Sequence, residues 1–169
     1  MNTTANRDEF LHLIEQNKGI IIKICNSYCR NVDDRQDLAQ EMIYQLWKSG
    51  NSFNQEYKFT TWMYRVALNV AISFYRKQRQ QREQPINEWH INIEEAPAES
   101  PEKERNISLL QEFISQMKEL DKAMILLWSE SRSYKEISEI VGITETNVAT
   151  RISRLKLKLK QQFSQHQKP

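Results

Sequence analysis

The distribution of proline restricts the fold of this chain more than any other feature. Three of the four prolines lie between residues 85 and 101, and the fourth is the last of the 169 residues. The segments before residue 83 and from 106 to 168 therefore contain no proline. Because proline disrupts helix interiors, two long proline-free segments predict an all-α fold.

The segment that separates these two parts has a different composition. Residues 83–105, EQPINEWHINIEEAPAESPEKER, hold seven glutamates against Lys103 and Arg105. Little helical periodicity is present, and the prolines favour irregular backbone. We expect two small helical domains, residues 1–82 and 106–169, joined by an acidic flexible linker at 83–105.

Helical periodicity places three main helices in the first domain. One helix is expected to begin at a cap formed by Asp33 or Asp34 and to stop at Gly50. A longer helix begins at Thr60 or Thr61, and its Trp62 and Phe74 are expected to be mostly buried. The helix that stops at Gly50 is expected to bury four residues: Leu38, Met42, Ile43 and Leu46.

The second domain is predicted to contain four helices. Asp121 is expected to cap the second helix, and Ser133 forms a capping box with Glu136 at the start of the third. Gly142 supplies the turn that follows, and Thr144 caps a final helix that runs to about residue 163. Two helices joined by a tight glycine turn, the second longer and basic, are the sequence form of a helix-turn-helix DNA reader.

The final helix carries two stripes at helical spacing. Val148, Ile152, Leu155 and Leu159 are expected to face the core, and the second stripe lies roughly 100° around the helix. Arginine can bind guanine, and asparagine adenine, through paired hydrogen bonds, which favours a DNA-reading role over a merely solvated face. The predicted DNA contacts are Thr146, Asn147, Thr150, Arg151, Arg154 and Lys158.

The long helix of the first domain mixes aromatic and basic residues. Aromatic rings can stack on unpaired bases while cations hold the backbone, as in single-strand binding. Trp62 and Phe74 are assigned mainly to the core. The residues expected at a single-stranded nucleic acid are Tyr64, Arg65, Asn69, Arg76 and Lys77, with Tyr75 nearby.

The net charge is only +2, but the basic residues are concentrated. Residues 58–82 contain six basic residues and no acidic one. Residues 146–169 also contain six basic residues and no acidic one. Two basic surfaces separated by an acidic segment predict two contacts with a polyanion.

Other classes of function find little support. His12, His90 and His166 are scattered, and no phosphate-binding loop or nucleophile motif is present, so the chain is not expected to be an enzyme. Cys25 and Cys29 lack further ligands for zinc and are expected to be reduced and buried. No cofactor or metal is expected.

The apolar runs are too short for a membrane span. The N-terminal sequence MNTTANRDEF has no basic start followed by an apolar stretch, so it does not resemble a secretory signal. We therefore expect a cytoplasmic protein.

Two motifs in the right order give the chain a specific resemblance. DLAQEMIYQLW at 37–47 with FTTWMYRVALNVAISFYRK at 59–77 resembles the second conserved region of extracytoplasmic-function sigma factors, and residues 133–160 resemble their fourth. The resemblance implies promoter recognition, promoter melting and transcription initiation. It also implies core RNA polymerase and promoter DNA as partners, an anti-sigma factor, and no obligate homo-oligomer.

The same resemblance assigns roles to individual residues. Phe53 and Asn69 fall where relatives capture a flipped base of the −10 element, and the final helix would bind the −35 element. The linker would pass through the active-site cleft and RNA exit channel of the polymerase. The implied contact face for the polymerase core consists of Asp37, Gln40, Glu41 and Tyr44.

A stand-alone helix-turn-helix regulator is the main alternative. Such a protein would use its N-terminal half to dimerise or to bind an effector. This hypothesis does not explain the 37–47 motif and the aromatic-basic helix together.

Overall fold

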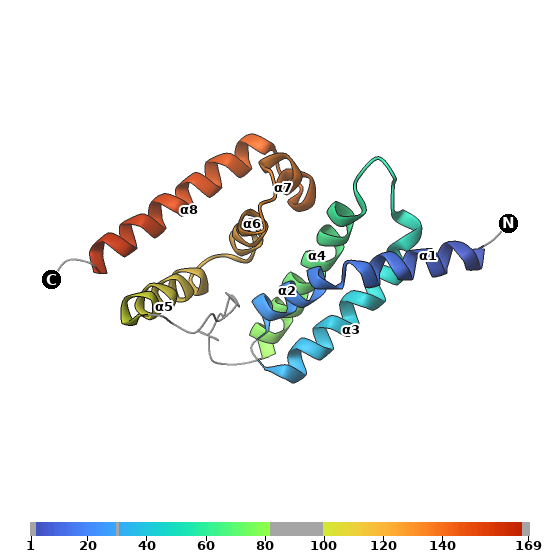
Figure 1. Ribbon diagram of the computed structural model, residues 1–169, viewed down its shortest axis with the longest axis horizontal. Helices are drawn as coiled ribbons and strands as arrows, with labels where there is room; N and C mark the ends of the chain where they lie inside the picture. Colours follow the sequence, from blue (N-terminus) through green and yellow to red (C-terminus); the bar gives the residue numbers. More distant parts are fainter. Residues whose placement is uncertain (1–2, 30, 82–99, 167–169) are drawn as a thin grey trace. The chain divides into compact units, whose positions relative to one another are not determined.

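The computed structural model describes residues 3–29, 31–81 and 100–166. Over these residues the chain forms eight α-helices and one short 3₁₀ turn, and no strand (Figure 1). The backbone separates into two compact units, Met1–Pro85 and Ile86–Pro169. The all-α, two-domain prediction is confirmed, whereas most of the predicted linker lies outside the described residues.

Each unit is built from helices that follow one another along the chain. The first unit contains α1 (Thr3–Gln16), α2 (Lys18–Tyr28), α3 (Val32–Ser49), the 3₁₀ turn η1 (Gly50–Ser52) and α4 (Phe59–Gln81). The second unit contains α5 (Pro101–Ser115), α6 (Glu119–Ser129), α7 (Tyr134–Val141) and α8 (Glu145–His166).

The core of the first unit lies between α2, α3 and α4, which pack against one another. On α3, Leu38, Met42 and Leu46 recur every four residues and have no exposed surface. Ile24 of α2 and Met63 of α4 are equally buried. Truncating one such residue to alanine costs about 2–5 kcal/mol, so this stripe holds α3 in place.

The start of α3 differs from the prediction. Asn31, and neither Asp33 nor Asp34, is the N-cap, because its side-chain oxygen accepts a 2.7 Å hydrogen bond from the backbone N–H of Asp34. The two aspartates instead occupy the first turn, where the helix dipole favours negative charge. Ile43 was also expected in the core and is 44% exposed, so that prediction is wrong.

Gly50 is the C-cap of α3, as predicted, and the space beside its backbone is restricted. A Cβ built on Gly50 would lie 2.9 Å from a ring carbon of Phe10, closer than such atoms pack. Phe10 thus passes over the backbone at the point where α3 gives way to η1. The glycine allows α1 to contact the loop that leads to α4.

The thiols of the first unit are buried and free. Cys25 and Cys29 are 4% and 5% exposed and form no disulfide, as predicted. Burial raises the pKa of Cys25 to about 11 and that of Cys29 to about 12, against a partial lowering by Arg35. Both groups are therefore protonated and chemically quiet near neutral pH.

The core of the second unit is formed where α6 and α7 pack on α8. Met124, Leu127 and Ile137 are fully buried there. The described part of the unit begins with Ser100, the N-cap of α5, whose first residue is Pro101. Residues 101–105, assigned to the linker from sequence, are thus helical, since proline is well tolerated in a first helical turn.

The helix-turn-helix forms as predicted. Ser133 and Glu136 make a reciprocal capping box at the start of α7, and Gly142 follows with φ of 77°, in the left-handed region that favours glycine. Thr144 caps α8 through a 3.2 Å hydrogen bond from the N–H of Asn147. The prediction for α6 is wrong: Lys118 is its N-cap, and Asp121 lies in its first turn.

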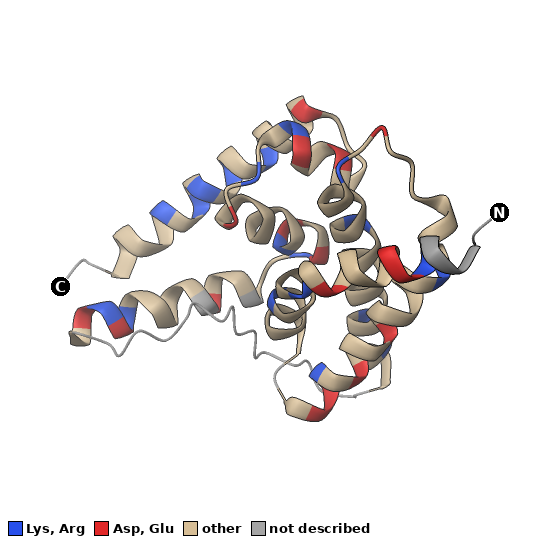
Figure 2. Cartoon of the chain, turned by 45° about the vertical axis from the view of Figure 1, so that its right-hand side comes forward, with Lys and Arg blue, Asp and Glu red and all other residues tan. Residues whose placement is uncertain are grey.

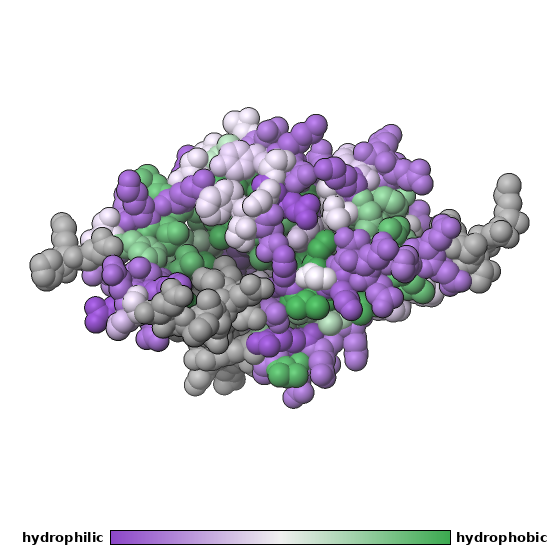
Figure 3. Space-filling model, viewed as in Figure 1, coloured by the Kyte–Doolittle hydropathy of each residue, from purple (hydrophilic) through white to green (hydrophobic). Residues whose placement is uncertain are grey.

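The surface that Figure 3 displays alternates between hydrophilic and apolar areas. Several large apolar side chains are more than two-fifths exposed, Val32 and Leu157 most of all. None of the described helices combines the length and the apolar character that crossing a membrane requires.

Candidate nucleic-acid interfaces

Helix α8 has one face in the core and another in solvent. Val148 and Ile152 have no exposed surface and Leu155 is 7% exposed, while Leu159 is half-buried. Lys and Arg positions recur along the helix (Figure 2). All six residues predicted to contact DNA are exposed: Thr146, Asn147, Thr150, Arg151, Arg154 and Lys158.

Arg151 makes a contact that the sequence did not reveal. Its Nη1 lies 3.3 Å from Oδ1 of Asp121, in the first turn of α6. The two side chains are 45% and 21% exposed, so the pair is at the surface but not fully solvated. The guanidinium of Arg151 is therefore directed by a residue thirty positions away.

Lys158 lies on the same flank of α8 as Arg151. It lines a groove of about 430 Å³, which Phe113 and Met117 also line. Arg154 is exposed without lining this groove. The predicted stripe therefore divides between residues beside other helices and residues turned toward solvent.

The side of α8 opposite its core also carries an apolar residue that sequence reasoning missed. Leu157 is 56% exposed. It follows Val148 by nine residues, which turns it about 180° from the buried stripe. A count of helical angles would have found it, because a leucine in that position cannot reach the core.

The other flank of α8 is held by an aromatic residue. Nζ of Lys156 lies 4.3 Å from the ring centroid of Trp128, a cation–π contact with the end of α6. Trp128 remains 41% exposed. Helix α6 thus contacts charged side chains of α8 both from its first turn and from its last.

In the first unit, α4 brings three of the predicted residues to one side. Arg65, Asn69 and Arg76 are exposed, and their spacing of four and seven residues keeps them on one stripe. Tyr64 departs from the expectation, because it is only 2% exposed and its ring is part of the core. Trp62 is 9% exposed, as expected of a core residue.

Phe53 belongs to an aromatic cluster. Its ring centroid lies 5.5 Å from that of Phe59 and 5.6 Å from that of Trp62, and Phe10 packs on both of these. Phe53 itself is half-buried. One part of this ring is thus available at the surface, while the rest supports the loop between η1 and α4.

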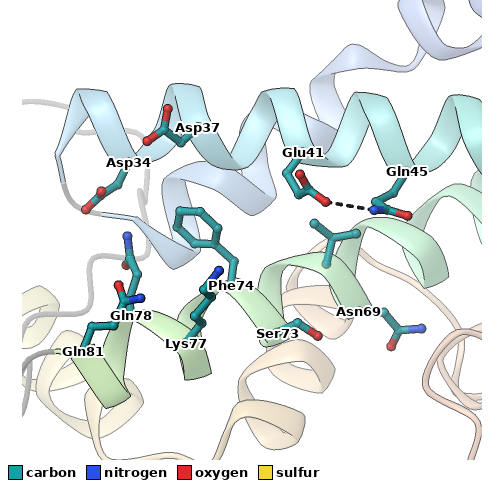
Figure 4. Close-up of a pocket in the computed structure, with 11 residues that line it drawn as sticks. Asp34, Asp37, Glu41, Gln45, Asn69, Ser73, Phe74, Lys77, Gln78 and Gln81 are labelled. Carbon is teal, nitrogen blue, oxygen red and sulfur yellow. Dashed lines mark hydrogen bonds between the residues drawn. The ribbon is translucent and has the colours of Figure 1, made fainter.

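A groove of about 890 Å³ runs between α3 and α4 (Figure 4). Asp34, Asp37 and Glu41 line it from α3, and Lys77 and Phe74 line it from α4. The Phe74 ring points from α4 toward α3, so this residue is half-buried and not in the core. Asn69 also lines the groove, which joins residues predicted for two different partners.

The exposed face of α3 is more apolar than predicted. Asp37, Gln40, Glu41 and Tyr44 are all exposed, Tyr44 by 51%. Ile43 and Trp47, which sequence reasoning did not assign to this face, are 44% and 45% exposed. The spacing of four residues between them was the available signal.

Comparison with known proteins decides the family. Residues 13–81 match the family Sigma-70 region 2, and residues 107–159 match Sigma-70, region 4. The ECF RNA polymerase sigma factor SigW of Bacillus subtilis is 26% identical, over 94% of this chain and 91% of SigW. The chain belongs to the extracytoplasmic-function sigma factors.

A second relative supports this assignment of the sigma factor. RNA polymerase sigma factor SigV of Bacillus subtilis is 29% identical, over 83% of this chain and 82% of SigV.

Solved structures share the fold of the sigma factor. The sigma factor RpoE of Bartonella quintana, in complex with the anti-sigma factor NepR, aligns with a TM-score of 0.70 at 18% identity. The alignment covers 92% of this chain and 97% of RpoE. CnrH, in complex with the cytosolic domain of CnrY, aligns with a TM-score of 0.64 at 20% identity, over 92% and 87% of the two chains.

The sigma factor is thus a DNA-binding transcription initiation factor that acts with RNA polymerase in promoter recognition and melting. The two matched regions are the ones expected from sequence, in the same order. A stand-alone regulator is not favoured, because such a protein has no need of region 2.

Proposed function

We propose that this sigma factor divides promoter recognition between α8 and α4, and that α3 attaches both to RNA polymerase. The observation that carries the proposal is the two-sided form of α8, which has a buried stripe at Val148, Ile152 and Leu155 and a separate exposed polar face. Such a helix can enter the major groove without losing its packing.

In this proposal α8 reads the −35 element. Arg151 and Arg154 can each grip a guanine through two parallel hydrogen bonds, and Asn147 can do the same with adenine. Thr146 and Thr150 have short side chains that can contact phosphates without filling the groove. The Thr150 hydroxyl also donates to the carbonyl of Thr146 at 2.9 Å. Lys158 contributes charge at the edge of the contact.

The −10 element is assigned to α4 and the preceding loop. Arg65, Arg76 and Lys77 would hold the backbone of the non-template strand, while Asn69 would bond a base edge. Phe53 would stack on the flipped base with the exposed part of its ring. The rings of Phe59 and Trp62 behind it support this role by holding it in place.

The polymerase contact is assigned to the exposed face of α3. Asp37, Gln40, Glu41 and Tyr44 form its polar part. Ile43 and Trp47 add an apolar part, since exposed aromatic residues are common anchors at protein interfaces. Charges at the rim would steer the encounter, and the apolar residues would hold the complex.

An anti-sigma factor is proposed as a further partner. RpoE and CnrH, which share the fold, are each complexed with another protein, in the case of RpoE a named anti-sigma factor. We assign the sigma factor to the cytoplasm, where RNA polymerase acts. We propose no enzymatic activity for it. No obligate homo-oligomer is proposed.

The domain limits follow the two regions. In this proposal residues 1–82 form the polymerase and −10 domain, and residues 106–169, together with the first residues of α5 at 101–105, form the −35 domain. The acidic segment between them would lie along the active-site cleft and RNA exit channel of the polymerase, where its charge resembles that of nucleic acid.

The proposal is tested with holoenzyme reconstituted from bacterial core polymerase. A −35 element selected from a randomised library is compared with versions substituted at single base pairs. Arg154→Ala should lose about 1–3 kcal/mol on the selected element and much less on one substituted version. Lys160→Ala should weaken binding to every element alike and reduce the salt slope by about one unit.

Uniform losses for Asn147, Thr150, Arg151 and Arg154 would remove α8 as the base reader. A wild-type holoenzyme that selects no −35 element at all would contradict the proposed function as a whole.

A further inference from the structure

Helix α6 contacts charged side chains of α8 at two points. Asp121, in its first turn, reaches Arg151 at 3.3 Å, and Trp128, near its end, lies under the ammonium of Lys156 at 4.3 Å. Of these two residues of α8, only Arg151 is a proposed base reader. The contact with Asp121 therefore concerns recognition directly.

The geometry of an arginine explains why such a contact matters. A guanidinium has five N–H donors in one plane, and a bidentate grip on guanine requires two of them to point along the base edge. Asp121 bonds one Nη1, so the remaining donors are directed away from α6 and their plane is restricted. An unrestrained arginine side chain would move between base edges and phosphates.

The contact contributes little to stability, because partly exposed ion pairs gain only modest energy in water. Its components nevertheless come from two helices thirty residues apart and meet only in the folded domain. A pair that adds little stability but fixes the direction of a reading side chain is suited to specificity.

We infer that Asp121 is a positioning residue for recognition of the −35 element. It orients Arg151 toward one base pair and so determines how strongly that pair is discriminated. This inference rests on the proposed role of α8 as the base reader. Asp121 itself would not touch DNA.

Two simpler roles predict different results. If Asp121 only stabilises the start of α6, its loss lowers stability and affects all DNA sequences equally. If it only adds negative charge near DNA, its loss strengthens binding to all sequences equally. A positioning residue instead changes the ratio between the preferred element and the element substituted at the Arg151 base pair.

The experiment uses full-length holoenzyme, four single variants and the double variant Arg151→Ala with Asp121→Asn. Arg151→Ala identifies the base pair through its sequence-specific loss. Asp121→Asn removes the carboxylate with little change in shape, and Asp121→Glu restores the charge. Glu145→Gln is the matched control, because it removes a negative charge from the first turn of α8 but no contact with Arg151. Thermal unfolding of each variant shows whether the domain is intact.

We expect Asp121→Asn to reduce discrimination at the Arg151 base pair about tenfold, the contribution of one good bidentate contact. Asp121→Glu should restore part of it, and Glu145→Gln should change affinity without changing the ratio. In the Arg151→Ala background, Asp121→Asn should have no further effect on the ratio.

An equal change on all elements for Asp121→Asn would overturn the inference, as would a loss of discrimination that persists without Arg151. If Arg151→Ala shows no base-specific loss while Arg154→Ala does, the inference fails and the proposed function stands. If the holoenzyme does not discriminate −35 elements at all, both fail.

Discussion

The two helices proposed to contact DNA differ in how their DNA-contacting residues are placed relative to the core. On α8 the polar residues and the core residues lie on separate faces, and Arg154 can be truncated without opening a cavity. On α4 the aromatic residues that suggested base stacking are largely structural, with Tyr64 at 2% and Trp62 at 9% exposure. Among the residues of α4 predicted to contact a single strand, the cations and Asn69 are exposed.

This difference fits what each helix is proposed to bind. A duplex presents base edges to polar side chains from outside, so a reader needs little apolar surface of its own. An unpaired base must be stacked, and a stacking ring must be held rigidly by other rings. In the first unit the core and the proposed stacking surface share one aromatic cluster, to which Phe53 belongs.

The largest effect should come from truncating a core residue of α4 and comparing it with the truncation of an exposed residue of α8. Tyr64→Ala should lower the free energy of unfolding of the first unit by about 3–5 kcal/mol, because it empties a packed core. Arg154→Ala should change stability by about 0.5 kcal/mol or less. Urea denaturation of both variants measures this, and equal stabilities would abolish the distinction between the helices.

The next effect concerns the part of the cluster that reaches the surface. Phe53→Ala and Asn69→Ala should leave closed-complex formation intact but impair promoter melting by about 1–3 kcal/mol, the contribution of one stacked base. Permanganate reactivity of the promoter bubble reports it. Phe59→Ala is the comparison: it removes a ring that supports Phe53 but is not proposed to touch a base, so it should impair melting less.

If Phe59→Ala impaired melting as strongly as Phe53→Ala, the effect would lie in the support of the loop. Reactivity equal to wild type for Phe53→Ala would remove this ring from base capture.

A smaller effect is expected where neither DNA helix is involved. The double reversal Asp37→Arg and Glu41→Arg should weaken binding to core polymerase about tenfold and leave thermal stability nearly unchanged, because both residues are exposed on α3. Fluorescence titration with core polymerase measures the affinity. Glu15→Arg, an exposed reversal on α1, should have no such effect, and an unchanged affinity of the double variant would contradict the assignment.

The smallest effect tests how firmly α8 is held on its second flank. Lys156→Ala should lower the stability of the second unit by about 0.5–1 kcal/mol through loss of the contact with Trp128. Lys160→Ala, four residues further along the same helix, should not. Equal melting temperatures for the two variants would mean that the stacked lysine contributes nothing.

The sequence was most informative where a signal is local. The capping box at Ser133, the left-handed Gly142 and the cap at Thr144 each depend on residues a few positions apart, and all three are present. The buried and exposed stripes of α8 were likewise visible, because helical periodicity is regular over its length.

The wrong predictions concern residues for which several local signals compete, or whose position depends on packing against other helices. Asn31, Asp33 and Asp34 are all good caps, and only the observed hydrogen bond selects Asn31. Ile43 follows Met42 directly, so it turns 100° away from the α2–α4 core despite its apolar side chain. Asp121 was assigned to a cap because it precedes an apolar helical segment, and its pairing with Arg151 across thirty residues leaves no trace in the sequence.

The condition of the two thiols has a practical consequence for spectroscopy. Cys25 and Cys29 are the only cysteines of the chain, and burial with pKa values of about 11 and 12 makes both slow to alkylate. Cysteines introduced at exposed Ser52 and Ser164, one in each unit, can therefore accept maleimide dyes without removal of the native thiols. A donor and acceptor pair at these positions would follow the separation of the two units in real time as polymerase and promoter are added.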